Sequence, residues 1–180
     1  MKHKLLILSL LISLSYSSIL AQEAQHPIVK GYGGIYEIED PVELVQPDKE
    51  YKILIELVSE NKNPEEHSFW INNVARLMNL HGIQGVPKEN LKVKVVVHGP
   101  AVLDILSNGN YFEKFRIAKN PNIPVLEALD EAGAEVIVCG QSLLARELAR
   151  DEIWSKTKVA TSALTTISKN VSEGYVLFKF

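Results

Sequence analysis

Short apolar runs alternate with segments of helical periodicity along most of the chain. The runs are rich in Val, Ile and Leu and are bounded by Gly, Pro, Asn and Asp, as expected of strands that are buried on both faces. They predict strands at Tyr51–Val58, Leu91–Val97 and Glu135–Val138, a very short strand at Val159-Ala160, and a last strand at Tyr175–Phe180.

Helical patterns fill the intervals between these runs. The first predicted helix begins with Asn63 as cap and Pro64 in the first turn, ends at Gly82, and buries one stripe. The residues of that stripe are Trp70, Val74, Leu77, Met78 and His81. Further helices are predicted from Pro100 to Leu106, from Asn122 to Ala132, from Ser142 to Arg150 and from Ser162 to Gly174.

Other segments give weaker or more local predictions. Asn108-Gly109-Asn110 is typical of a turn, and Tyr111–Asn120 fits either a loop or a short helix. In the last helix, the helical spacing predicts that Ala163, Leu164, Ile167 and Val171 face inward.

The order of these elements indicates the fold class. Strands that alternate with helices are typical of a parallel sheet with helices on both faces. The chain has 180 residues and 46% hydrophobic residues, which is enough for one such domain. We therefore expect an α/β domain over residues 51–180, with a mostly parallel sheet of about five strands.

The first 21 residues have the pattern of a secretory signal peptide. A basic start (Lys2, Lys4) precedes the apolar stretch Leu5–Leu14, and small residues lead to Ala21 as the cleavage position. The apolar stretch is short for a membrane span, which favours cleavage over an uncleaved anchor. We expect an exported protein, periplasmic or secreted, with no membrane attachment after cleavage.

Residues 22–50 interrupt any regular pattern. Pro27, Pro41 and Pro47 break the segment, and several glycines loosen it. We predict an N-terminal arm that packs on the domain or on a neighbouring subunit, with partial disorder as the alternative.

Composition excludes several classes of function. The net charge is −3, and no basic stripe with interleaved aromatic residues is present, so we expect no nucleic-acid partner. A single cysteine excludes an intrachain disulfide. No Cys-x-x-Cys or His-x-x-x-His spacing is present, so we expect no metal site and no cofactor.

Cys139 is the main candidate for chemistry. It follows the predicted strand Glu135–Val138 and precedes a helix, at the edge where parallel sheets place their sites. Gly140 permits close backbone approach, and the helix amides and Arg146, seven residues on, would favour a thiolate. The alternative is a cysteine that packs as a small apolar residue, since cysteines are often buried.

Other polar residues lie near the same predicted edge. His98 follows the strand Leu91–Val97, so it would approach Cys139 if the two strands are neighbours. It would then orient or deprotonate a substrate, or act only as a hydrogen-bonded residue before a helix. Gln141 and Ser142 would donate hydrogen bonds to a bound anion from the first helical turn.

The stretch around Cys139 resembles the DsrE/DsrF-like sulfur-relay family. The family pattern is a strand, a cysteine and an Ala-Arg pair six and seven residues beyond it, which Cys139, Ala145 and Arg146 match. The turn from Val97 to Val102, which contains His98 and Gly99, is similar to that of exported members, as are Ser162-Ala163-Leu164 and Gly174-Tyr175. The resemblance spans roughly Tyr51 to Phe180.

The resemblance implies a three-layer α/β/α fold, assembly into trimers or hexamers, and a cysteine that accepts sulfur as a persulfide. Together with the positions of the residues along the chain, this gives Cys139, Arg146 and His98 as candidate reacting or stabilising residues, and Gly99, Gly140, Gln141 and Ser142 as candidate ligand-binding residues. A protein that donates or accepts sulfur would be the partner. Some members have a second cysteine where this chain has Ser142, and some have Gly where it has Glu147.

Two functions follow as hypotheses. The first is a sulfur carrier in which Cys139 is both acceptor and donor. The second is a non-catalytic periplasmic module that binds a small ligand or a protein in the same pocket. Without a second cysteine, an internal thiol relay is excluded for either function.

Overall fold

A parallel five-stranded sheet forms the centre of the structure, a computed structural model that describes residues 22–180. The strands are β1 (Tyr51–Leu57), β2 (Leu91–Val97), β3 (Glu135–Cys139), β4 (Lys158–Ala160) and β5 (Val176–Lys179). Their order is β4-β3-β2-β1-β5, and every pair is parallel. The predicted α/β fold with a parallel sheet of five strands is confirmed. The predicted signal peptide, residues 1–21, lies outside the described residues.

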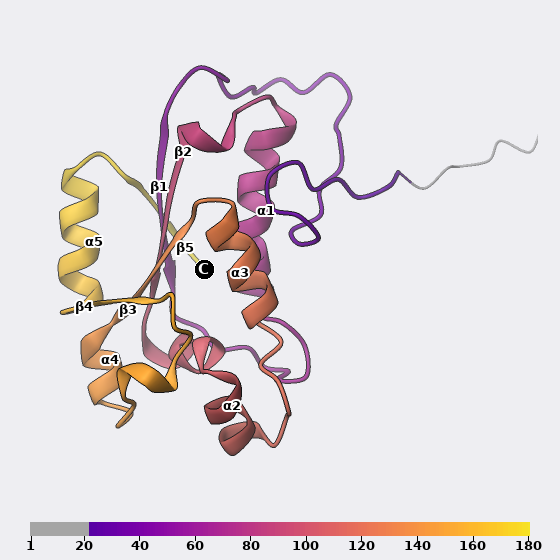
Figure 1. Ribbon diagram of the computed structural model, residues 1–180. Coiled ribbons are helices and arrows are strands. Elements are labelled where there is room, and N and C mark those ends of the chain that lie inside the picture. Colours follow the sequence, from indigo (N-terminus) through magenta and orange to yellow (C-terminus); the bar gives the residue numbers. More distant parts are fainter. Residues whose placement is uncertain (1–21) are drawn as a thin grey trace, which may run out of the picture.

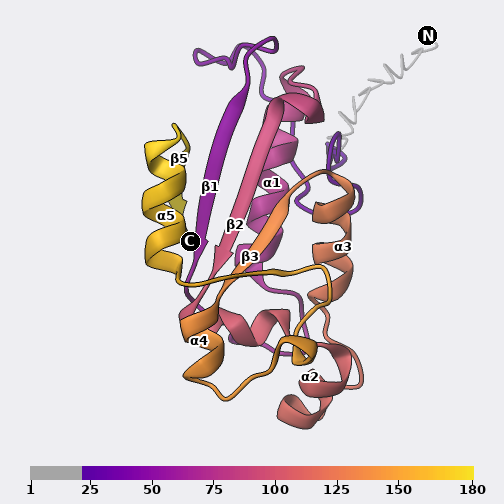
Figure 2. The same ribbon diagram turned by 60° about the vertical axis from the view of Figure 1, so that its left-hand side comes forward.

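Helices cover both faces of the sheet, consistent with the expected three layers. Helices α1 (Phe69–Ile83) and α3 (Ile123–Glu131) lie on one face, and α5 (Ala163–Ser172) lies on the other (Figure 1). Helices α2 (Asn108–Phe115) and α4 (Gly140–Leu144) lie beyond the carboxyl ends of the strands (Figure 2). Within residues 22–180, the remaining helices are of the 3₁₀ type: η1 (Lys88–Asn90), η2 (Gly99–Ile105) and η3 (Arg150–Glu152).

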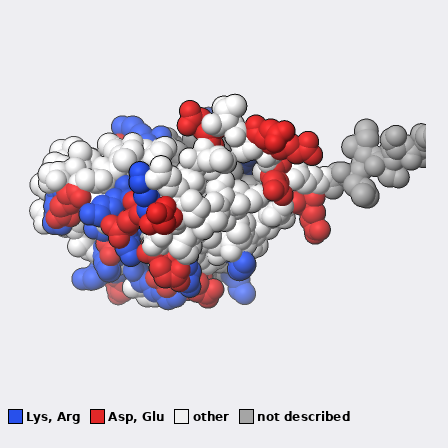
Figure 3. Space-filling model, turned by 90° about the horizontal axis from the view of Figure 1, so that it is seen from above, with Lys and Arg blue, Asp and Glu red and all other residues white. Residues whose placement is uncertain are grey.

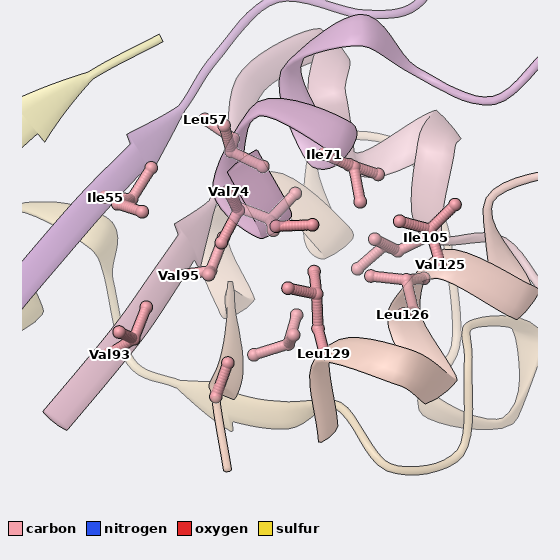
Figure 4. Close-up of a cluster of buried hydrophobic side chains, with 14 of the residues drawn as sticks. Ile55, Leu57, Ile71, Val74, Val93, Val95, Ile105, Val125, Leu126 and Leu129 are labelled. Atoms are coloured by element: carbon pink, nitrogen blue, oxygen red, sulfur yellow. The ribbon is translucent and has the colours of Figure 1, made fainter. Parts of the chain in front are cut away.

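The main core lies between the sheet and the layer formed by α1 and α3. Alternate residues of β1 and β2, such as Ile55 and Val95, meet Val74 of α1 and Leu129 of α3 (Figure 4). All four side chains are buried. Each Å² of apolar surface that is removed from water stabilises the fold by about 25 cal/mol. This side of the sheet supplies most of the hydrophobic stabilisation.

The opposite face of the sheet has a smaller core. Leu54, Val96, Cys139 and Ala163 form a buried cluster beneath α5. Polar groups share this face, because Lys94 Nζ donates to Asn170 Oδ1 of α5 at 2.7 Å. Cys139 therefore belongs to the thinner and more polar of the two layers.

The N-terminal arm packs on α1. Asn79 of α1 accepts hydrogen bonds from the backbone N–H groups of Ile28 and Val29 through Oδ1, at 2.9 and 2.8 Å. Its Nδ2 donates to the carbonyl oxygens of Val29, Tyr32 and Gly33. A Cβ on Gly33 would lie 2.1 Å from the backbone nitrogen of Arg76, so only glycine allows the arm to approach α1 this closely.

Two helix boundaries differ from the predictions. Helix α1 begins at Phe69, after Ser68, rather than at Asn63 and Pro64. The Ser68 backbone N–H donates to Asn122 Oδ1 at 2.6 Å, which ties the start of the helix to α3. The predicted turn at Asn108-Gly109-Asn110 is wrong, because these residues form the first turn of α2. Ser107 caps that helix by accepting from the Asn110 N–H.

Two further predictions on helices need correction. The helix predicted from Ser142 to Arg150 is only the short α4, and Glu147 after it has a left-handed φ of 54°. In α5, Ala163 is buried as predicted, but Leu164 is 78% exposed and Val171 is 46% exposed. The sheet beneath α5 covers only one side of the helix, so these two apolar side chains face outward.

Charges of both signs are distributed over the surface. Seen from above, Lys and Arg side chains are interspersed with Asp and Glu, and no continuous basic stripe crosses that face (Figure 3). Among residues 22–180, no helix is both long and apolar enough to span a bilayer.

Candidate functional site

The candidate site lies where β2 and β3 end side by side. Val97 of β2 is paired with Val138 of β3, so the next residues, His98 and Cys139, occupy neighbouring positions at the carboxyl edge. Adjacent strands lie about 4.8 Å apart. The sheet therefore places the two residues that the sequence suggested as partners, His98 and Cys139, at adjacent positions.

The environment of the Cys139 thiol favours the thiolate. Burial raises the pKa of the Cys139 thiol, but the Ser142 hydroxyl and the backbone N–H groups of Ala163, Ser142 and Gln141 lower it by more. The net pKa is below the ordinary value for cysteine. No hydrogen bond to the Cys139 sulfur is found within residues 22–180, so these groups act on the thiol as nearby donors. They come from the first turns of α4 and α5, where backbone N–H groups are free.

Ser142 links the thiol to the end of β2. Its Oγ accepts a hydrogen bond from the Gly99 N–H at 3.1 Å. An accepted hydrogen bond leaves the hydroxyl proton free for another acceptor, and the nearby sulfur is one. Gly99 has a left-handed φ of 57°, which glycine adopts without strain. Ser142 and Gly99, expected as ligand-binding residues, thus stand next to the thiol.

Gly140 permits the tight packing beside Cys139. A Cβ at this position would lie 2.8 Å from the Ala160 carbonyl oxygen of β4, a distance that Cβ atoms essentially never show. A pocket of about 450 Å³ adjoins this contact, with Gly140, Gln141, Leu144, Val159, Ala160 and Thr161 in its wall. Cys139 is 5% exposed and does not line the pocket, so the thiol lies just behind its wall.

Arg146 follows α4 and is not among the residues that line the pocket beside Gly140. Its guanidinium donates to the Ser142 carbonyl oxygen at 3.2 Å, one turn back along the chain. It also lines a separate pocket of about 500 Å³ with Leu103, Leu106, Asn110, Glu113, Lys114 and Leu148. The structure therefore places the Arg146 guanidinium against the carbonyl oxygen of Ser142, one of the residues that lower the pKa of Cys139.

His98 has a partner that the sequence did not suggest. Its Nε2 lies 2.7 Å from Glu56 Oε1, and the side chain of Glu56 is largely buried on the interior strand β1. Glu56 also lies 3.3 Å from Lys179 Nζ, through Oε2. The only sign in the sequence is one acidic residue inside the apolar run Ile53–Val58.

No group of three or more possible metal ligands occurs in the described part of the chain. The polar residues at the edge are a thiol, a hydroxyl, an amide and one imidazole–carboxylate pair. This set suits sulfur chemistry or the binding of a small polar ligand.

Two solved structures are similar in fold to this protein. No match was found among curated proteins. A protein of unknown function from Methanobacterium thermoautotrophicum, MTH1491, is similar in structure with a TM-score of 0.54 and 17% identity, over 73% of this chain and 100% of that chain. The ychN protein from E. coli has a TM-score of 0.53 and 17% identity, over 72% of this chain and 99% of its own. At this identity, the two structures show a shared fold.

The sequence comparison identifies the family. Residues 52–180, from the second residue of β1 through the last strand, match the DsrE/DsrF-like family. The match includes the neighbouring β2 and β3 ends with His98 and Cys139. The chain therefore belongs to the DsrE/DsrF-like family.

Proposed function

We propose that this protein carries sulfane sulfur as a persulfide on Cys139. The observation that carries the proposal is the group of donors around the thiol, which lowers the pKa of Cys139 even though burial raises it. A thiolate is the form that attacks sulfur, so these donors favour the reacting state. Membership of the DsrE/DsrF-like family, a sulfur-relay family, supports the same chemistry.

The proposed reaction transfers one sulfur atom. The Cys139 thiolate attacks the outer sulfur of a donor persulfide, R–S–SH, and a new S–S bond forms as the S–S bond of the donor breaks. The departing thiolate, R–S⁻, takes up the proton that Cys139 lost. The products are the Cys139 persulfide and R–SH, so no external oxidant is consumed.

Incubation with a low-molecular-weight persulfide is expected to add the mass of one sulfur atom to the wild-type protein. Cys139→Ala is expected to add none, because it removes the only thiol in the chain. Intact mass spectrometry measures both, and a reducing thiol is expected to restore the original mass of the wild type. Ser155→Ala, at an exposed position, keeps Cys139 and the groups that lower its pKa, so this control is expected to gain the same mass as the wild type.

An unchanged mass for the wild type would contradict the sulfur-carrier proposal. The second candidate would then remain, a module that binds a small polar ligand in the pocket bounded by Gly140, Gln141 and Thr161. The low exposure of the thiol and the adjoining pocket of about 450 Å³ are the observations that favour it.

We also propose that the protein is exported and assembles with copies of itself. Residues 1–21 have the composition of a signal peptide. Exposed apolar residues occur on α5 (Leu164 and Val171) and on the edge strand β5 (Val176, Leu177 and Phe178), and self-association would cover apolar surface of this kind. Native mass spectrometry of protein from expressing cells is expected to show chains that lack residues 1–21, in complexes of more than one copy. Full-length monomers would contradict both parts.

A further inference from the structure

A carboxylate on an interior strand of the sheet requires a physical reason. Glu56 is 8% exposed and lies on β1 between buried apolar residues. Burying a charge is costly unless it is paired and hydrogen-bonded. The carboxylate is paired on both sides, with His98 at 2.7 Å and Lys179 at 3.3 Å.

The contact with Glu56 favours one tautomer of His98. An ionised carboxylate only accepts hydrogen bonds, so Nε2, which faces Glu56 Oε1, must carry a proton. In the neutral ring, Nδ1 then carries the lone pair. No hydrogen bond to Nδ1 is found within residues 22–180. Glu56 therefore holds the ring with its free basic nitrogen available at the edge of the sheet.

The sheet places His98, which carries this ring, at a backbone position next to that of Cys139. His98 and Cys139 follow the register pair Val97 and Val138 on neighbouring strands. The link from the Gly99 N–H to Ser142 Oγ joins the residue after His98 to a residue that acts on the sulfur. Carboxylate, imidazole and thiol thus follow one another across β1, β2 and β3.

Most other charged groups on this face have partners elsewhere. Lys94 binds Asn170, Lys158 pairs with Glu135, and Lys169 pairs with Glu173. Lys52 Nζ lies 3.4 Å from the Glu173 carbonyl oxygen. Lys179 contacts the second oxygen of Glu56, which leaves Oε1 directed at His98.

We propose, on the basis of the sulfur-carrier function above, that Glu56 is a positioning residue that holds His98 as the base for Cys139. The S–H bond of Cys139 breaks and an N–H bond forms at His98 Nδ1, which gives an imidazolium beside the Glu56 carboxylate. The thiolate then attacks the donor persulfide. The departing R–S⁻ takes the proton from Nδ1, so His98 returns to its starting state.

Glu56→Gln is expected to slow alkylation of Cys139 by iodoacetamide about tenfold at about pH 7. The reason is that a neutral amide does not stabilise the imidazolium that accompanies the thiolate. Alkylation rates from about pH 5 to about pH 9 are expected to show the profile displaced to higher pH. His98→Gln is expected to give the same displacement, and the double variant to give no more than His98→Gln alone.

Glu135→Gln is the matched control. It removes one carboxylate from the neighbouring strand β3 through the same substitution, but Glu135 contacts Lys158 and not His98. Its alkylation profile is expected to equal that of the wild type. A wild-type profile for Glu56→Gln would overturn the proposal, because loss of a purely structural ion pair changes stability but not the titration of the thiol.

A second measurement needs no variant. The ¹⁵N chemical shifts of His98 in the wild-type protein are expected to show the proton on Nε2, and a proton on Nδ1 would overturn the proposal. Persulfide loading distinguishes failure of the sulfur-carrier function from failure of the proposed role of Glu56. A wild type that takes up no sulfur contradicts the sulfur-carrier function, whereas equal profiles for wild type and Glu56→Gln contradict only the role of Glu56.

Discussion

Asn79→Ala is expected to lower the free energy of unfolding by about 3 to 5 kcal/mol and to release the N-terminal arm. The Asn79 side chain makes five hydrogen bonds to the backbone of the arm. A typical hydrogen bond contributes about 1 kcal/mol net, and more is lost when buried backbone groups stay unpaired. Urea unfolding measures the loss, and limited proteolysis detects cleavage within residues 22–35.

The matched control for this effect is Asn73→Ala. Asn73 lies on the same helix, and its side chain makes no hydrogen bond within the part of the chain described. Both substitutions gain the same helix propensity, of less than about 1 kcal/mol. If the two variants proved equally stable and equally resistant to protease, the arm would not depend on Asn79.

Asp104→Asn is expected to stabilise the protein by about 3 kcal/mol at about pH 7.5 and by much less at about pH 4. Burial raises the pKa of Asp104 from 3.8 to about 6. The hydrogen bond that the Asn61 backbone N–H donates to the carboxylate lowers the pKa, but by less than burial raises it. The folded state therefore binds the proton more tightly than the unfolded state. The stability that the neutral acid contributes is complete below about pH 3.8 and is lost as the pH rises through about 6.

Asparagine retains an oxygen that accepts the Asn61 N–H but carries no charge at any pH, so it avoids the cost of burying a carboxylate. Urea unfolding at several pH values measures the difference between the two proteins. The control is Asp48→Asn at an exposed position, where a change within about 0.5 kcal/mol is expected. A constant difference between Asp104→Asn and the wild type across this range would show that Asp104 titrates normally.

The sheet was largely predictable because buried parallel strands have a composition of their own. The apolar runs placed β1, β2 and β3 to within about one residue, as strongly patterned segments allow. Strand order does not follow from those runs. That β2 and β3 are neighbours, and hence that His98 and Cys139 are adjacent, became known only from the register.

The helix boundaries were harder because more than one residue suited each cap. Asn63 and Ser68 are both acceptable before a helix, and the contact between Ser68 and Asn122 of α3 favours the later start. Asn108-Gly109-Asn110 has the composition of a turn, yet Ser107 accepts a hydrogen bond from Asn110 and begins a helix. Tertiary contacts and a single cap overrode local propensity in these places.

The site was predictable only in part, for a similar reason. Cys139 stood out as the single thiol after a strand, and the structure gives it donors from two helix starts. Glu56 was missed because its partners, His98 and Lys179, are distant in sequence. Contacts of this kind leave no local pattern, so a lone acid in an apolar strand is the only sign of them.

The position of β5 has a consequence for how the chain folds. Ile53 of β1 pairs with Val176 of β5, so this contact closes a loop that contains almost the whole domain. Closing a long loop costs chain entropy before the new contact contributes any stabilisation, so pairings between distant strands form slowly. We infer that β1 keeps an open edge until β5 docks. During refolding, that edge is available to strands of other molecules, so dilute conditions favour recovery of the native protein.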